Sequence, residues 1–319
     1  MDISMHAPSA SALTHLRPSN ARGNAVFVAG TSVTVLAIWL SLAGGWAGWI
    51  AGQTMLAIVL VHWFTVLHEC GHRTLFRSRR ANTIVGVVAG FLAMIPYRVW
   101  VRVHGRHHKW TGWQDLDPTA ESLVPRELSR IERIVLNVCW RFWIPLFATM
   151  YRSENYWRPD RLARMFPRRE DKAAMLRNGV LQLLGYAAIV LLVDPFTLAR
   201  AVAAGIVLSF IIEDILLLSQ HAHVPMNHSD GERVPPVPAV AQEVFTRSLR
   251  LPAWASNVLL HFDAHELHHM YPFVPGHHLR KIPYQPAHEV SWLEWVRVSK
   301  QIPGATLLFQ NRHDTGIEI

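Results

Sequence analysis

Cysteine is scarce in this sequence. Only Cys70 and Cys139 occur among 319 residues, and their spacing does not pair them. Neither a disulfide framework nor a cluster of thiolate metal ligands is expected, and the reactive part is expected in a reducing compartment. The sequence also lacks a Cys-rich iron–sulfur pattern, a haem attachment motif and a G-x-G-x-x-G nucleotide fingerprint. Any redox chemistry therefore needs a separate electron carrier.

Charged residues are also few, at 17% of the chain, whereas half of the residues are apolar. The chain contains 13 Trp and has a net charge of +8. Its basic residues lie between long apolar runs and not in one patch or arm, so no nucleic-acid partner is expected. This composition predicts a membrane protein with a basic face, and the lipid bilayer is its expected partner.

Four apolar runs have lengths near the roughly 20 residues that cross a bilayer. They cover residues 25–42, 46–67, 176–193 and 196–218. Only small residues separate the first two runs, and Asp194-Pro195 separates the last two. The sequence predicts an all-α integral membrane protein with two transmembrane hairpins, a tail at residues 1–24 and a single domain at residues 25–319.

Two further apolar runs, at 84–95 and 134–150, are short or interrupted, so we expect interfacial or re-entrant helices there. Basic residues concentrate at 73–109 and 152–169, whereas the turns within the hairpins carry almost none. The positive-inside rule then places the long loops and both chain ends in the cytoplasm. Three tryptophans of these loops are expected as interfacial anchors: Trp100, Trp110 and Trp113.

Histidine is abundant, with 19 residues, and eight of them form three clusters: HECGH, HGRHH and HELHH. The i, i+3 and i+4 spacings place the imidazoles of each cluster on one face of a helix. Two HxxHH clusters far apart in one chain rarely arise by chance. The eight clustered residues are His68, His72, His104, His107, His108, His265, His268 and His269.

Eight imidazole nitrogens are too many for one tetrahedral or octahedral ion but suit two ions. Imidazole binds Fe, Zn, Cu or Ni, so the ligand type alone does not name the metal. The absence of cysteine ligands argues against an iron–sulfur cluster and against blue copper. A membrane setting with an apolar substrate favours iron that activates oxygen.

The three clusters resemble, in order and topology, the histidine boxes of the membrane fatty-acid desaturases, most closely those of acyl-lipid desaturases. The similarity covers roughly residues 61–279, including HHMYPFVPGHHL, where Met270 and Tyr271 replace the commoner Leu and Phe. The resemblance implies a cytoplasmic helical cap that carries the boxes and a diiron centre held by the eight histidines. It also implies O2-dependent desaturation of an acyl chain, with electrons from a ferredoxin or a cytochrome b5-like protein.

Members of that family often have a further ligand at the cytoplasmic end of the fourth membrane helix, where this chain has Gln220-His221-Ala222-His223. His221 is the first candidate and His223 the second. Asp214 lies seven residues before His221 in an apolar run, where an unpaired acid is costly, so a role in orienting an imidazole is expected. Asp263 is a second candidate for this role.

Three other functions stay open from the residues. A diiron hydroxylase or ketolase that acts on a carotenoid or another apolar substrate needs the same ligands. A zinc membrane metallopeptidase would use HExxH, which HECGH and His265-Glu266-x-x-His269 both satisfy, but it leaves HGRHH unexplained. A transport protein would more naturally place polar residues at the membrane midplane.

Overall fold

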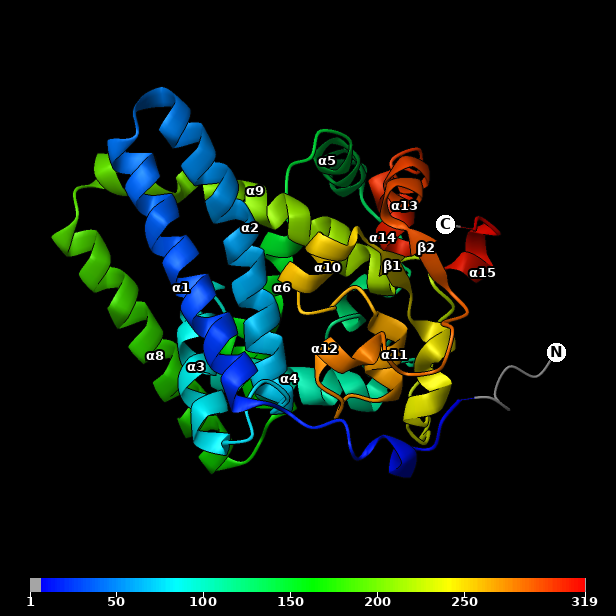
Figure 1. Ribbon diagram of the computed structural model, residues 1–319. Helices are drawn as coiled ribbons and strands as arrows, with labels where there is room; N and C mark the ends of the chain where they lie inside the picture. Colours follow the sequence, from blue (N-terminus) through cyan, green and yellow to red (C-terminus); the bar gives the residue numbers. More distant parts are fainter. Residues whose placement is uncertain (1–6, 319) are drawn as a thin grey trace. The chain divides into compact units, whose positions relative to one another are not determined.

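The computed structural model describes residues 7–318, so the first six residues of the predicted tail lie outside the described part. The described chain is mainly helical, with almost no sheet (Figure 1). Its longer helices are α1 (Asn20–Ala43), α2 (Gly45–His72), α3 (Arg79–Leu92), α4 (Tyr97–Trp110), α5 (Arg130–Arg141), α6 (Leu146–Tyr156), α8 (Arg169–Leu192) and α9 (Pro195–His221).

Several shorter helices and two strands are also present in the described chain, joined by loops. The shorter helices are α7 (Pro159–Met165), α10 (Ala253–Val258), α11 (His265–Met270), α12 (Gly276–Leu279), α13 (Trp292–Ser299), α14 (Gly304–Phe309), α15 (Arg312–Thr315), and 3₁₀ helices at Ala10–Leu13, Glu121–Leu123 and Ala239–Phe245. Strands β1 (Ser248–Arg250) and β2 (Glu289–Ser291) pair in parallel, with Leu249 opposite Val290.

The helices α1, α2, α8 and α9 are long and apolar enough to cross a membrane, which confirms the all-α membrane fold. They lie where the four spans were predicted. Helix α1 begins at Asn20, earlier than the apolar run, because the Ser19 side chain accepts a hydrogen bond from the Arg22 N–H. Helix α2 continues to His72, so the first histidine box lies on its last turns.

Two helix pairs, α3 with α4 and α5 with α6, are each apolar enough for a span but are sharply bent at a short break. The breaks fall before Pro96 and Pro145, where Met94 and Trp143 have φ near +60°. The interfacial or re-entrant helices predicted at residues 84–95 and 134–150 lie at these two places.

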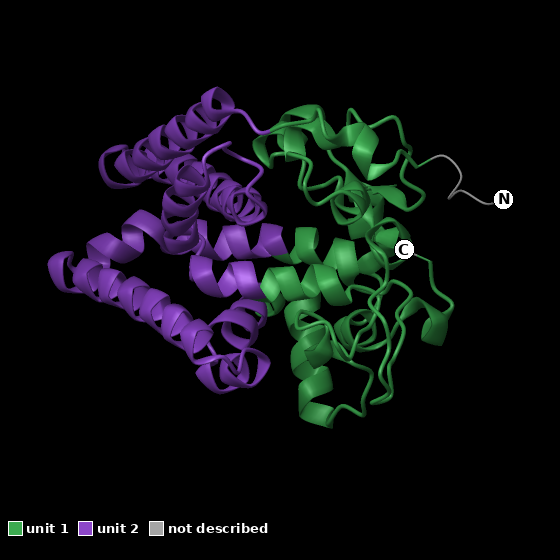
Figure 2. Cartoon of the chain, turned by 90° about the horizontal axis from the view of Figure 1, so that it is seen from below, with its two compact units in different colours: residues 1–17, 103–147, 214–319 green, residues 18–102, 148–213 purple. Residues whose placement is uncertain are grey.

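The chain forms two compact units, coloured separately in Figure 2. Unit 2 contains residues 18–102 and 148–213. Its buried Gln53 side chain donates to Ser41 Oγ on α1 and to the Ala201 carbonyl on α9, at 2.8 Å each, and accepts from the Gly205 N–H at 2.7 Å. A polar side chain inside a membrane helix is thereby satisfied, and three helices are tied together.

A second polar contact of unit 2 lies between α6 and α9. The Arg152 guanidinium donates to the buried Glu213 carboxylate at 2.6 Å and lies over the Phe210 ring. Both charges are buried, and each satisfies the other.

Unit 1 contains residues 103–147 and 214–319 together with residues of the N-terminal segment up to Arg17. Leu13 from the predicted tail is 3% exposed and packs with Leu267, Tyr271 and Leu279 in one apolar cluster. The Tyr271 hydroxyl also donates to the Pro8 carbonyl at 2.7 Å. Part of the tail is therefore an ordered support for the third histidine box.

Candidate metal centre

The first histidine box forms the last turns of helix α2 in unit 2. The ring centroids of His68 and His72 lie 4.8 Å apart, as an i, i+4 pair on one helical face should. The helix ends directly after His72 because Arg73 adopts a left-handed conformation with φ of 63°. The Thr74 N–H and hydroxyl both donate to the Glu69 carbonyl, at 2.9 and 3.0 Å.

Packing against Trp100 holds this box in place. The Trp100 ring is 1% exposed and lies edge-on to both imidazoles, with centroids 5.5 Å from His68 and 6.3 Å from His72. A Cβ at Gly71 would come within 2.0 Å of the same ring. The glycine of HECGH therefore leaves room for the Trp100 ring. This ring is buried against the two imidazoles of the box and is not the interfacial anchor that we expected.

In unit 1, α4 and α11 bring two boxes together. The Nε2 atoms of His104 and His108 lie 3.0 Å apart, and Nε2 of His268 lies 3.0 Å from Nε2 of His108. His104 and His268 are buried, and His108 is partly buried. We call these three residues the trio.

A second group in unit 1 consists of His107, His221, His265 and His269, which we call the quartet. One ligand nitrogen from each lies within 4.8 Å of the others. Nε2 of His265 lies 2.7 Å from Nε2 of His221 and 3.1 Å from Nε2 of His269. Three helices supply it: α4, the last residue of α9, and α11. Neighbouring histidines of one box, such as His268 and His269, thus belong to different groups.

Hydrogen bonds orient two imidazoles of the quartet. Nδ1 of His107 lies 2.7 Å from Oδ2 of Asp117 and 3.0 Å from the Thr119 hydroxyl. Nδ1 of His269 lies 2.9 Å from Oε1 of Gln242. Because a carboxylate only accepts, His107 donates its Nδ1–H and keeps its Nε2 lone pair for a ligand; the amide oxygen of Gln242 does the same for His269.

Electrostatics favour a charged Asp117 and a neutral His269. Burial alone would raise the pKa of Asp117, but the His107 ring and the hydrogen bonds from His107 and the Thr119 N–H lower it below its usual value. Burial, followed by the neighbouring imidazoles, lowers the pKa of His269 well below its usual value. The carboxylate is therefore charged and the imidazole of His269 neutral, which is the form that binds metals.

The donor set fits metal ions. In both groups Nε2 atoms face one another at 2.7 to 3.1 Å, and an oriented imidazole directs a lone pair at its neighbours. Lone pairs that converge in this way repel unless a cation lies among them. Imidazole ligands from three helical segments, with an outer carboxylate behind one of them, are typical of a metal centre.

The structure separates the two candidates for the further ligand. His221 belongs to the quartet. His223 has a left-handed backbone with φ of 55°, and its ring nitrogens bond to the Gln310 carbonyl at 3.0 Å and the Thr315 hydroxyl at 2.7 Å. The His223 imidazole is thus engaged by the C-terminal segment.

The two acids selected from the sequence have other contacts. Asp214 lies two helical turns, or about 10 Å, before His221. Its negative charge is close enough to the Lys300 ammonium and the Cys139 thiol to influence their pKa values. Asp263 accepts hydrogen bonds from the Ser256 hydroxyl at 2.7 Å and from Arg280. Asp117 is an acid whose carboxylate contacts a box imidazole in unit 1.

The glutamates of the two HExxH patterns accept hydrogen bonds from a threonine hydroxyl and from backbone N–H groups. Glu69 accepts from the Thr74 hydroxyl at 2.9 Å. Glu266 accepts from the Ser248 N–H at 3.0 Å and from the His288 N–H at 2.7 Å. Burial raises the pKa of Glu266 to about 7 despite these bonds. Neither carboxylate is held as the base of a zinc peptidase would be.

Sequence reasoning missed Asp117, Gln242 and Trp100. Asp117 lies ten residues after His107 in a turn, and its only signal is the acid-rich stretch that follows HGRHH. Gln242 lies in a 3₁₀ helix well before the third box, where no periodic pattern points to it. Trp100 lies four residues before His104, and only its tertiary packing against the first box shows its role.

Comparison with known proteins agrees with this architecture. A model of the fatty acid desaturase family matches residues 44–288. The chain therefore belongs to the fatty acid desaturase family, which implies an oxidoreductase, and its apolar helices make it a multi-pass membrane protein.

Its relatives are distant. An sn-1 oleoyl-lipid 12-desaturase of Picosynechococcus is 22% identical over 266 residues, covering 78% of this chain and 70% of that protein. A Delta(12) fatty acid desaturase of Mortierella isabellina is 32% identical over 83 residues, covering 26% of this chain and only 20% of that protein. An oleoyl-12-hydroxylase of Ricinus communis is 28% identical over 93 residues, covering 29% and 23%.

Proposed function

We propose that this protein is a membrane-bound diiron acyl-lipid desaturase that uses O2 to introduce a C=C bond into a fatty acyl chain. The observation that carries the proposal is the pair of converging imidazole groups in a chain of the fatty acid desaturase family. Unlike sequence spacing alone, the two groups support a proposal in which successive box histidines bind different ions.

The proposed ligand set contains the eight box histidines and His221. The quartet holds one ion. The trio holds the other. His68 and His72 are the remaining ligands of the proposed set; three imidazoles leave coordination positions open on an ion, whereas the quartet already supplies four.

When bound, the iron pair supplies O2-dependent oxidation of unactivated C–H bonds. Two hydrogens leave neighbouring carbons, and O2 takes them up with two electrons from the carrier and two protons from solvent, giving two waters. The side chains prepare this step. Asp117 fixes the proton of His107 on Nδ1, and Gln242 does the same for His269. Burial of His107, His265 and His269 limits access of water.

The proposal includes an orientation and a partner. Both termini and the histidine boxes lie on the cytoplasmic side, where the Arg-rich segments at 73–109 and 152–169 belong by the positive-inside rule. The electrons come from a ferredoxin or a cytochrome b5-like protein, and a basic face suits an acidic carrier. Residues 25–319 act as a single desaturase domain.

Hydroxylation is the second candidate, and one relative favours it. The similar protein of Ricinus communis is named an oleoyl-12-hydroxylase. The same ligands serve both outcomes, because loss of a second hydrogen gives a double bond and transfer of oxygen gives a hydroxyl. The product therefore decides between them.

The test is expression in a host with defined lipids, followed by mass spectrometry of the fatty acids released from its membranes. The parent protein should produce new unsaturated acyl chains, and His107→Ala should produce none while it still inserts in the membrane. His313→Ala is the control, because this side chain is exposed on α15 and outside both groups. Hydroxylated chains would select the hydroxylase, and an active, metal-replete His107→Ala variant would overturn the ligand assignment.

A further inference from the structure

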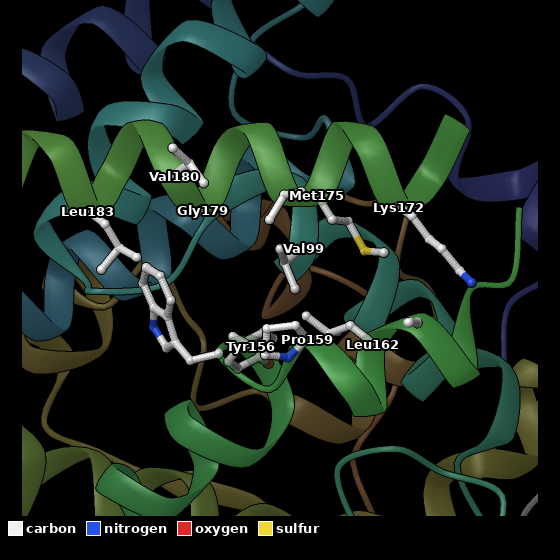
Figure 3. Close-up of a pocket in the computed structure, with 12 residues that line it drawn as sticks. Val99, Tyr156, Pro159, Leu162, Lys172, Met175, Gly179, Val180 and Leu183 are labelled. Carbon is white, nitrogen blue, oxygen red and sulfur yellow. The ribbon is translucent and has the colours of Figure 1, made fainter. Parts of the chain in front are cut away.

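An apolar groove runs along helix α8 within unit 2. Its volume is about 300 Å³. Figure 3 shows Met175, Val180 and Leu183 of α8 on one side and Tyr156, Pro159 and Leu162 on the other, with Lys172 at one end. Apart from Lys172 and the Tyr156 side chain, the lining is almost entirely apolar. Such a lining suits a hydrocarbon ligand.

The groove has the length of one leaflet of a bilayer. Lys172 and Leu183 are eleven residues apart on α8, which corresponds to roughly 16 Å along a helix. Half of a hydrocarbon core of about 30 Å is close to this length. An acyl chain that starts at Lys172 would therefore reach the middle of the membrane at the far end of the groove.

Helix α8 faces lipid more than the other candidate spans do. Only 11% of its apolar window is buried, against 22 to 72% for the other three. Leu176 and Leu183, which both line the groove, are 63% and 53% exposed. The groove is thus open to a molecule that diffuses in the bilayer.

Lys172 supplies a cation at the polar end. Its side chain is exposed in the first turn of α8. The neighbouring Asp171 is already held by Arg102, through Nε at 2.9 Å and a second nitrogen. Within residues 7–318 no ion pair is found for Lys172. An ammonium group at the headgroup level attracts anionic phosphate.

From this combination we infer that the groove binds one anionic phospholipid, with an acyl chain along α8 and its phosphate at Lys172. The inference goes beyond the proposed activity, since the groove lies wholly in unit 2 and uses none of the proposed ligands. The bound lipid acts as a fixed component of the fold that fills the space between α8 and the segment from Tyr156 to Leu162.

Gly179 provides a way to close the groove. A Cβ added there would lie 3.9 Å from the Trp157 ring and meet nothing else within 4 Å. Gly179→Phe therefore places a ring in the groove without a backbone clash. Gly179→Ala is its matched control, because it leaves most of the volume open and favours the helix.

The experiment is native mass spectrometry of the detergent-purified, delipidated protein titrated with phosphatidylglycerol. The parent should retain one phosphatidylglycerol per chain, and Gly179→Phe should lose it. Lys172→Gln should weaken binding about fivefold, the loss expected for one cation beside an anionic headgroup. Gly179→Ala and Arg169→Gln, an exposed cation on α8 outside the groove, should bind as the parent does.

Additional ligands separate the possible sources of the anion. Phosphatidylcholine should bind more weakly, and inorganic phosphate or palmitate should not displace phosphatidylglycerol. Unchanged binding in both Gly179→Phe and Lys172→Gln, or preferential binding of palmitate, would overturn the inference. His107→Ala should retain the lipid, so a failure of the desaturase proposal leaves this test intact.

Discussion

In unit 2 the first histidine box packs against a buried ring, whereas in unit 1 hydrogen bonds orient two imidazoles of the quartet. His68 and His72 stand at the end of a 28-residue helix, against the ring of Trp100. The quartet includes residues of α11, which has only six residues. The Asp117 carboxylate and the Gln242 amide orient two of its imidazoles.

The two arrangements should fail in different ways. A packed site is sensitive to volume, because an interior at crystal-like density has little room for an added methyl group. A hydrogen-bonded site is sensitive to the identity of one polar atom, because a lost acceptor frees the imidazole to change tautomer and rotate. The predictions below test this difference, from the largest expected effect to the smallest.

Replacement of His221 should have the largest effect. His221→Ala removes a quartet nitrogen and should abolish activity and lower the iron content, as measured by a product assay and by elemental analysis. His223→Ala is the matched control, since its imidazole is bonded to Gln310 and Thr315. Equal losses in the two variants would contradict the assignment of His221.

Asp117→Asn should come next. The amide can turn its NH2 toward His107 and favour the wrong tautomer, so activity or metal affinity should fall 10- to 100-fold, the loss typical of an outer carboxylate. Titration of the metal-free protein with Fe²⁺ measures the affinity. Asp115→Asn, which alters a carboxylate that binds Ser229, should leave the metal affinity unchanged; a shared loss would show a general defect of the loop.

Gly71→Ala tests the packed box. The new methyl group would come within 2.0 Å of the Trp100 ring, and overpacking of this kind costs about 1 to 3 kcal/mol. A lower midpoint of thermal unfolding should report it. Gly71→Ala combined with Trp100→Ala should be less destabilised than the sum of the single changes. Additive effects would mean that the ring does not set the need for glycine.

Gln242→Ala should have the smallest effect of the four. The change removes the acceptor of the His269 Nδ1–H, and a buried donor without a partner costs about 1 to 3 kcal/mol, partly offset by relaxation of the ring. A modest loss of metal affinity is expected. Gln242→Glu keeps an oxygen acceptor for His269 but loses the bonds that the amide NH2 donates to the His108 and Val237 carbonyls, so it should recover only part of the metal affinity. A Gln242→Ala variant that binds metal as tightly as the parent would contradict a role of this hydrogen bond in orienting His269.

The contrast between local packing and tertiary hydrogen bonds also explains which features can be predicted from the sequence. Apolar length and helical spacing are local properties, so the four spans and the three boxes follow from the residues alone. The ends of α1 and α8 differ from the apolar runs because polar residues such as Ser19 and Arg169 extend the helices. Asp117 and Gln242 meet their histidines only through tertiary folding, and no periodicity marks them.

Asp214 shows what a local argument omits. Its burial was predicted to need a partner, and residues seven apart share a helical face. Yet two turns of rise separate Asp214 from His221, and the structure brings Lys300 near Asp214 instead. The Lys300 ammonium also lies over the rings of Trp140 and Trp143, at 3.5 and 3.7 Å. A helical wheel omits the rise along the axis, and it cannot anticipate a partner from another segment.

Elemental analysis of the purified protein tests the central claim most directly. Fe and Zn per chain would be measured in protein from iron-supplemented cells, for the parent and for a His107→Ala, His268→Ala double variant. The account predicts about two iron ions per parent chain, as two imidazole groups require, and their loss in the variant. A single zinc ion that survives in the variant and depends on His68 and His72 would contradict it.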